Sequence, residues 1–246
     1  MSENIKKIMK AFKVDLDSSK NQNIILKPSA RPFNNQAHQV NEVPAKIAEK
    51  IYNLIKDAKH PNDDTILNHN KIKKAFFSPF KPQLKDAKVF LSHLHADKNK
   101  ALEVKDYLES ETDHRVFIDS LFWDYKDDVL NELAKYDNTS KIEDAFTLIL
   151  RESLQDMIEK CPYFVFLQSN NSVSNQGLSC TTYSAWVYEE LKIANGLIAD
   201  SALQESRIKA MRVSHNITNL LRRFKSISLD SLCKKISFNF ITKDLE

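Results

Sequence analysis

Short apolar segments alternate with amphipathic helical patterns through the last two thirds of the chain. The strand-like segments are KVFLSHL, RVFID, YFVFLQS and RIKAMRV, at residues 88–94, 115–119, 163–169 and 207–213. Helical spacing of apolar residues covers residues 97–109, 124–136, 153–160 and 184–199. Strands that alternate with helices predict parallel βαβ units. Because the runs VFL and FVFL in the first and third of these segments are apolar on both faces, we expect an α/β fold with helices on both sides of a parallel sheet.

The N-terminal third has a different pattern. Residues 1–41 are polar and show little periodicity, which predicts an irregular arm. Apolar residues at helical spacing predict a helix over residues 44–59 and a shorter one over residues 64–77. The segment SPFKP at residues 78–82 then marks a boundary. We therefore predict an N-terminal polar arm and helical region at residues 1–82, followed by the α/β domain at residues 83–246.

Composition removes several classes of function. The chain of 246 residues has only two glycines, Gly177 and Gly196, so neither a P-loop nor a GxGxxG dinucleotide turn is present. A net charge of +3 without a dense basic stripe does not favour nucleic acid. The three cysteines are scattered, and neither a membrane span nor a signal peptide is evident. We expect a cytoplasmic protein that binds neither nucleic acid nor membrane.

Two adjacent glutamates lie on the helix predicted over residues 184–199. Its core-facing stripe contains Val187, Leu191, Ala194 and Ile198. At about 100° per residue, Glu189 lies on the opposite side of the helix, whereas Glu190 lies at the margin of the stripe. Glu190 either solvates the positive end of the helix or faces a cleft. Because this helix follows the third predicted strand, where ligands of parallel sheets gather, we predict that Glu190 faces the edge of a cleft.

Polar residues also follow the first two predicted strands. Ser92 and His93 end the first, and Asp119 ends the second, with Phe122 and Trp123 close behind it. The segment SHLHADK at residues 92–98 resembles a metal-binding HxHxDH sequence, but Lys98 replaces the final histidine and would repel a cation. We therefore expect no metal here. In the alternative interpretation, His93 ends a strand and Asp97 caps the next helix.

Four segments together resemble a Toll/interleukin-1 receptor (TIR) domain of bacterial type. They are VFLSH, VFID, VFLQSNNS and SAWVYEEL, at residues 89–93, 116–119, 165–172 and 184–191. The resemblance covers residues 86–240 and leaves residues 1–82 outside it. Leu94 and the long insertion at residues 137–160 depart from the family pattern.

The resemblance implies a flavodoxin-like fold with a five-stranded parallel sheet. It also implies cleavage of NAD+ at the bond between nicotinamide and ribose, with release of ADP-ribose or a cyclic isomer. The family's catalytic glutamate corresponds to Glu190, and Ser184 is expected beside it. The expected substrate-binding residues are Ser92, His93, Asp119, Phe122, Trp123, Ser184 and Trp186. Of these, Phe122 and Trp123 are expected in the loop after the second strand, and Trp186 is expected to form a wall of the pocket.

The resemblance implies partners as well. NAD+ is expected as a substrate rather than a cofactor, and no other cofactor is expected. Self-association through the TIR domain and a downstream effector protein are expected, in the setting of bacterial antiviral defence signalling. Two alternatives stay open: a non-catalytic adaptor that acts only through TIR–TIR contact, and a nucleoside-processing hydrolase or transferase of related fold.

Overall fold

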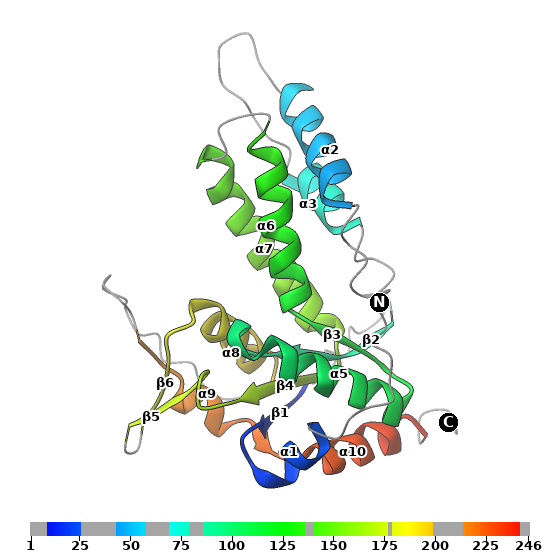
Figure 1. Ribbon diagram of the computed structural model, residues 1–246, viewed down its shortest axis with the longest axis vertical. Helices are drawn as coiled ribbons and strands as arrows, with labels where there is room; N and C mark the ends of the chain where they lie inside the picture. Colours follow the sequence, from blue (N-terminus) through cyan, green and yellow to red (C-terminus); the bar gives the residue numbers. More distant parts are fainter. Residues whose placement is uncertain are drawn as a thin grey trace, which may run out of the picture. The chain divides into compact units, whose positions relative to one another are not determined.

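The computed structural model describes residues 9–25, 43–57, 69–78, 86–135, 140–176, 179–198 and 214–241. The chain divides into two units, both visible in Figure 1. The sheet unit comprises residues 1–29, 87–119 and 157–246, and the helical unit comprises residues 30–86 and 120–156. Each unit is built from segments that are far apart in the sequence.

The sheet unit contains a five-stranded, all-parallel sheet in the order β3-β2-β4-β1-β8. The strands are β1 (Lys10–Asp15), β2 (Ala87–Ser92), β3 (Arg115–Ile118), β4 (Tyr163–Gln168) and β8 (Lys225–Ser226). If β2 is counted first, then β3, β2 and β4 take the 2-1-3 positions of a flavodoxin-like sheet. The predicted α/β fold with a five-stranded parallel sheet is confirmed.

The fourth position of this sheet is occupied by a strand from the N-terminal end of the chain. β1 runs parallel to β4 from the pair Lys10 and Tyr163 to the pair Asp15 and Gln168. The prediction that residues 1–41 form an irregular arm is therefore wrong for this segment, which continues into helix α1 (Ser19–Ile25). The strand predicted at residues 207–213 lies outside the described residues.

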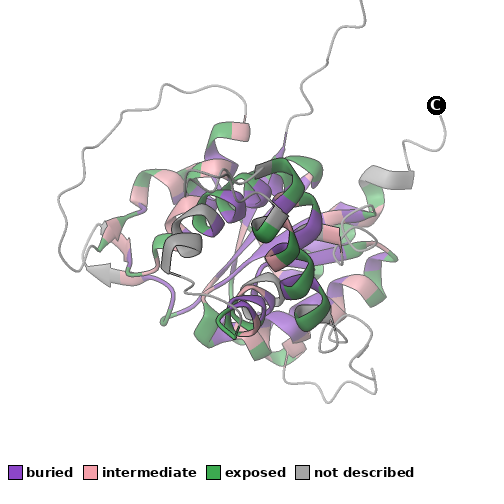
Figure 2. Ribbon diagram, turned by 90° about the horizontal axis from the view of Figure 1, so that it is seen from above, coloured by how far each residue is buried: buried purple, intermediate pink, exposed green. Residues whose placement is uncertain are grey.

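Helices cover the sheet. They are α5 (Lys98–Thr112), α8 (Ala185–Leu197), α9 (Thr218–Arg222) and α10 (Leu229–Ile241), besides α1 and a short 3-10 turn at His95–Asp97. α5 contacts both α1 and α10, whereas α8 contacts α9. Figure 2 shows the strands as buried residues, with exposed residues on the outer surfaces of the helices. The helices expected at residues 97–109 and 184–199 are confirmed within a few residues.

Aromatic packing fixes the strands against one another. Phe90 on β2 stacks on Phe164 on β4, with ring centroids 5.6 Å apart, and Phe164 meets the edge of Phe224 at 5.5 Å. Phe90, Phe164 and the neighbouring Leu91 have no exposed surface. Such close packing in the sheet interior holds the strand ends, and the polar residues on them, in fixed positions.

A small antiparallel sheet accompanies α8. Its strands are β5 (Ser174–Gln176), β6 (Ser179–Thr182) and β7 (His215–Asn216). β6 leads directly into α8, and Thr218, the first residue of α9, accepts a hydrogen bond from the Cys180 backbone amide on β6 at 2.7 Å. The start of α8 is thus anchored by a second sheet.

Four helices form the helical unit: α2 (Val43–Asp57), α3 (His69–Phe77), α6 (Ser120–Leu133) and most of α7 (Ser140–Lys160). The first two belong to the β1–β2 connection and the last two to the β3–β4 connection. Phe76 is buried between Tyr125 and Phe146, at ring-centroid distances of 5.1 and 5.4 Å. The helical region therefore extends beyond residues 1–82, because residues 120–156 complete its core. The insertion at residues 137–160 corresponds to α7.

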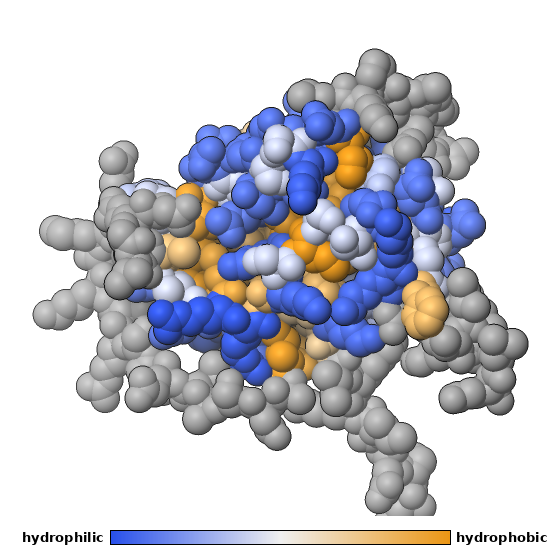
Figure 3. All heavy atoms as spheres, turned by 90° about the horizontal axis from the view of Figure 1, so that it is seen from below, coloured by the Kyte–Doolittle hydropathy of each residue, from blue (hydrophilic) through white to orange (hydrophobic). Residues whose placement is uncertain are grey.

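The side of the molecule below α1 and α10 in Figure 1 has a mixed surface. In Figure 3, hydrophilic residues surround separate hydrophobic areas on that side. Phe238 on α10 is among the exposed large apolar side chains, with 69% of its surface accessible.

In the part of the chain that the structure describes, no helix combines the length and the apolar character needed to cross a bilayer.

Candidate active site

Four polar side chains meet where β2 and β3 end and α8 begins. Ser92 is the last residue of β2, His93 follows it, and Asp119 follows β3 directly. Glu190 reaches them from the second turn of α8. Ser92 and Glu190 have no exposed surface, and His93 and Asp119 are only 3% and 4% exposed. The structure therefore brings together four residues that the sequence had predicted for one site.

A short hydrogen bond joins the strand to the helix. The Ser92 hydroxyl donates to Oε2 of Glu190 at 2.5 Å. The other carboxyl oxygen, Oε1, is buried and has no hydrogen-bond partner among the described residues. A buried acceptor without a partner is uncommon, because leaving it unsatisfied costs about 1–3 kcal/mol. Oε1 is therefore the atom of this carboxyl group that is available to a ligand.

Ser184 acts at the beginning of α8. It is the N-cap residue, and its hydroxyl accepts a hydrogen bond from the backbone amide of Val187 at 3.2 Å. This bond satisfies one of the free amide groups of the first turn and fixes the direction in which the helix starts. Since Val187 is buried, the phase of the helix places Glu190 on its inner side, where it is fully buried rather than at the edge of a cleft as the sequence predicted. Ser184 thus supports the position of Glu190 through the helix.

Asp119 links His93 to Glu190. Nδ1 of His93 and Oδ1 of Asp119 lie 2.7 Å apart, at ion-pair distance although not in hydrogen-bond geometry. The negative charge of Asp119 also raises the pKa of Glu190. Asp119 therefore acts on both groups electrostatically, within one buried cluster.

The pKa of Glu190 is raised well above the ordinary value of a glutamate. The largest cause is complete burial, which disfavours the charged form, and the next are the charge of Asp119 and the hydrogen bond shared with it. The hydrogen bond from Ser92 acts in the opposite direction, because it favours the ionised carboxylate.

A second polar cluster lies at the ends of β2 and β4, where the strand order of the sheet reverses. Asp97 is 2% exposed and accepts hydrogen bonds from the Ser169 hydroxyl at 2.5 Å and from Nδ2 of Asn171 at 3.0 Å. Asp97 is the N-cap residue of α5, but its side chain makes no capping hydrogen bond. The predicted capping role is therefore wrong, because Ser169 and Asn171 take up its carboxylate instead.

The two histidines of the SHLHADK segment, His93 and His95, have different surroundings from Asp97. His93 faces Asp119, and His95 is exposed. Among the described residues, no three His, Cys, Asp or Glu side chains are arranged to hold a metal ion. The arrangement therefore gives no support to the metal interpretation of this segment.

The N-terminal segment contributes to this edge of the sheet in a way that the sequence did not predict. Asp17, between β1 and α1, accepts a hydrogen bond from the backbone amide of Asn170 at 2.7 Å and lies 3.4 Å from the Lys100 ammonium. Residues 1–41 carry no apolar run that marks them as part of the sheet, so this contact has no signal in the sequence pattern.

The aromatic residues expected at the site behave differently from one another. Trp186 lies on the first turn of α8 and is half-buried. Phe122 and Trp123 belong to α6, which begins at Ser120 immediately after Asp119. The expectation that these two residues lie in a loop after the second strand is therefore wrong, since the helix starts at once. Their side chains lie outside the described part of the structure.

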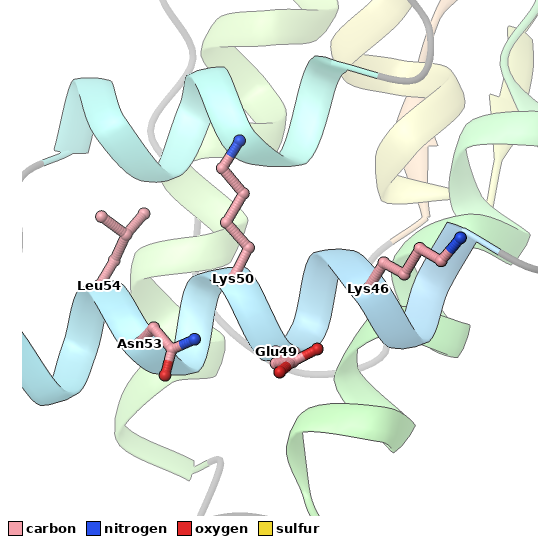
Figure 4. A pocket seen from close by; sticks show the side chains of 5 residues that line it. All are labelled: Lys46, Glu49, Lys50, Asn53 and Leu54. Carbon is pink, nitrogen blue, oxygen red and sulfur yellow. The ribbon is translucent and has the colours of Figure 1, made fainter.

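Two hollows of the surface lie away from Glu190. One, of about 410 Å³, is next to the ends of β1 and β8 and is lined by polar residues that include Lys13, Asp15, Gln168 and Ser228. The other, of about 340 Å³, lies along α2 in the helical unit. Figure 4 shows that its lining side chains, among them Lys46 and Lys50, project from α2. Lysines and a glutamate on one side of an amphipathic helix are typical of a solvated helix face.

Comparison with known proteins identifies no family for this chain. No family model matches it, and no match is found among curated proteins or among solved structures.

Proposed function

We propose that the sheet unit is a TIR-like enzyme that cleaves NAD+ between nicotinamide and ribose. The observation that carries this proposal is Glu190, a buried carboxyl group at the ligand-binding edge of a flavodoxin-like sheet, with Oε2 held by Ser92 and Oε1 without a partner. Three of the four TIR-like segments, at residues 89–93, 116–119 and 184–191, contain the residues of this site. The products are nicotinamide and either ADP-ribose or a cyclic isomer.

The chemistry needs one well-placed carboxylate. As the bond between the ribose carbon and the nicotinamide nitrogen breaks, its electron pair returns to the ring, so nicotinamide leaves as a neutral molecule without an acid. The ribose carbon becomes cation-like, as in glycoside hydrolysis. The Glu190 carboxylate, preorganised by Ser92, stabilises that charge and the ribose hydroxyls. Water, or an internal nitrogen of the adenine, then attacks the ribose carbon. When water attacks, the attacking water loses a proton.

Glu190 has no exposed surface in this structure, so NAD+ reaches it only after neighbouring groups move. This closed arrangement is the observation that favours the second candidate, a non-catalytic adaptor that acts through TIR–TIR contact. An adaptor, however, has no use for a buried carboxyl oxygen left without a partner. Self-association and an effector partner in antiviral defence signalling are part of the first proposal. A cytoplasmic location stays a prediction from the sequence.

The test is nicotinamide release from NAD+ by the purified chain, both dilute and at high protein concentration. We expect release by the wild type, loss of at least about a hundredfold in Glu190→Gln, and near-normal release in Glu189→Gln. Glu189 is the matched control because it lies next to Glu190 on the same helix but is half-exposed.

Three outcomes contradict the proposal. Full activity of Glu190→Gln removes the site assignment, and turnover of free nucleosides without action on NAD+ indicates the nucleoside-processing alternative. Absence of release in either condition, together with concentration-dependent self-association, indicates the adaptor.

A further inference from the structure

The helix that carries Glu190 is held at its far end by one arginine side chain. Arg223 follows α9 directly, and its Nη1 donates a hydrogen bond to the backbone oxygen of Asn195 at 2.7 Å. Its Nη2 donates to the backbone oxygen of Ile198 at 2.8 Å. Both acceptors lie at the end of α8, where a helix leaves its last carbonyl groups without partners of its own. The guanidinium group also places a positive charge at the negative end of the helix.

Asn195 makes this contact reciprocal. Its side-chain oxygen accepts a further hydrogen bond from Nη1 of Arg223, and its Nδ2 donates to the backbone oxygen of Leu220 in α9 at 3.0 Å. Asn195 is only 2% exposed, so its polar groups depend on these partners rather than on water. Side chains of both segments therefore join the end of α8 to α9.

α9 is in turn fixed to the sheets. Phe224, directly after Arg223, is buried and meets the edge of the Phe164 ring of β4 at 5.5 Å. At the start of α9, Thr218 accepts the hydrogen bond from Cys180 on β6, the strand that leads into α8. Arg223 therefore connects the end of α8 to groups that are packed within the sheet unit.

We infer that Arg223 is a positioning residue for Glu190, because it fixes where α8 lies along its own axis and thereby whether the carboxyl group meets Ser92. The bond between Ser92 and Glu190 is 2.5 Å long and fully buried, so the surroundings leave little room for adjustment. A helix advances by about 1.5 Å per residue, and a displacement of α8 by less than one residue therefore breaks this bond. Ser184 holds one end of α8 and Arg223 holds the other. The catalytic consequence rests on the function proposed above.

Hydrogen exchange of the purified chain tests the positioning without any enzymatic activity. Arg223→Gln removes the charged fork, and Arg222→Gln is the matched control, since Arg222 is the exposed neighbouring arginine. In Arg223→Gln, exchange of backbone amides should increase by about tenfold in the last turn of α8 and also in the turn around Glu190, while β4 stays protected. The control should leave all three regions unchanged. Arg223→Lys, which keeps the charge but not the fork, should give an intermediate increase.

Two patterns of exchange overturn the inference. An increase confined to the last turn of α8 means that Arg223 only prevents fraying there. An equal loss of protection in β4 means that the variant destabilises the whole sheet unit and that Arg223 has no particular relation to Glu190.

Turnover gives an independent readout. Arg223→Gln should lower kcat for nicotinamide release by about tenfold and leave KM for NAD+ within about threefold, because the substrate still binds but the carboxyl group is displaced. In the Ser92→Ala background the contact is already lost, so the same change should lower kcat by less than about twofold. A tenfold loss in both backgrounds shows that Arg223 does not act through this contact and overturns the inference.

Failure of the inference and failure of the proposed function give different results. If the wild type releases no nicotinamide while exchange around Glu190 responds to Arg223→Gln, the positioning role stands and the proposed function fails. If the wild type is active and Arg223→Gln changes neither exchange around Glu190 nor kcat, the proposed function stands and the inference fails.

Discussion

Ser92 and Glu190 are 98 residues apart in the sequence and are joined by a hydrogen bond of 2.5 Å in the interior of the sheet unit. One residue ends the strand β2 and the other lies on α8, so the bond fixes this helix to the end of that strand. Neither side chain has exposed surface. Their contact thus depends on correct assembly of the whole unit.

We expect Ser92→Ala to destabilise the protein by about 1–3 kcal/mol, because it leaves a buried carboxyl oxygen without its donor. The measurement is urea unfolding followed by circular dichroism. Ser110→Ala is the control: this serine is on α5, its hydroxyl bonds only within the helix in an exposed position, and the change should cost less than about 0.5 kcal/mol. Equal losses in the two variants would contradict the importance of the Ser92 bond.

Glu190 should make the stability of the protein depend on pH. In the unfolded chain it ionises near the ordinary value of 4.5, whereas its folded pKa is higher. As pH rises between these two values, the unfolded chain releases a proton that the folded protein retains, so stability falls. Glu190→Gln removes this loss, and its melting temperature relative to the wild type should increase as pH rises above the ordinary pKa of 4.5. Glu189→Gln should show no such trend. A difference that does not vary with pH would mean that Glu190 titrates normally.

Asp97 should be important for the stability of the edge where β2 and β4 end. Asp97→Asn removes the charge and one acceptor from a carboxylate that binds Ser169 and Asn171, so we expect a loss of about 1–3 kcal/mol in chemical unfolding. Asn99→Ala, an exposed change two residues away, should alter stability by less than about 0.5 kcal/mol. If Asp97→Asn is neutral, its hydrogen bonds contribute nothing that solvent does not replace.

The segment Lys10–Asp15 should behave as part of the core. Val14 has no exposed surface, and Val14→Ala should lower the free energy of unfolding by about 1–3 kcal/mol. Lys13→Ala, on the neighbouring residue, should change it by less than about 0.5 kcal/mol. Equal and negligible effects would agree with the irregular arm that the sequence pattern predicts.

The contrast between β1 and the central strands shows which features the sequence reveals. The strands around Phe90 and Phe164 stand out because continuous apolar runs can only be accommodated inside a covered sheet. β1 is six residues long, carries lysines at positions 10 and 13, and is followed by a polar segment. Its place beside β4 is determined by a partner about 150 residues away, which no local pattern records.

The site shows the same division. Helical phase alone placed Glu190 at the margin of the core-facing stripe, although the structure buries it fully, and the strand ends indicated Ser92 and Asp119. The contact of Asp119 with Glu190 depends on how the ends of β3 and α8 meet, so the raised pKa of Glu190 was not predictable from spacing. For Phe122 the resemblance predicted a loop, whereas this residue lies in α6.

The helical unit should respond on its own to a change in its core. Phe76→Ala removes a buried ring that packs on Tyr125 and Phe146, and we expect it to cost about 3–5 kcal/mol. Hydrogen exchange should increase in α2, α3 and α6, while β2 and β4 stay protected. Lys73→Ala, which removes the ion pair with Asp156 at 2.7 Å, should cost less than about 1 kcal/mol. Equal loss of protection in both units would show that they unfold together.

The position of β1 in the sheet has a consequence for synthesis of the chain. β1 leaves the ribosome early, but its neighbour β4 begins at Tyr163, and β8 on its other side begins at Lys225. At about 5–20 residues per second, the strand waits roughly 8–30 s for its first partner. During that interval both of its edges are unpaired, a condition that promotes association between nascent chains. Lys10 and Lys13 place charged side chains on this waiting strand, and charged side chains on an unpaired edge reduce its pairing with another chain.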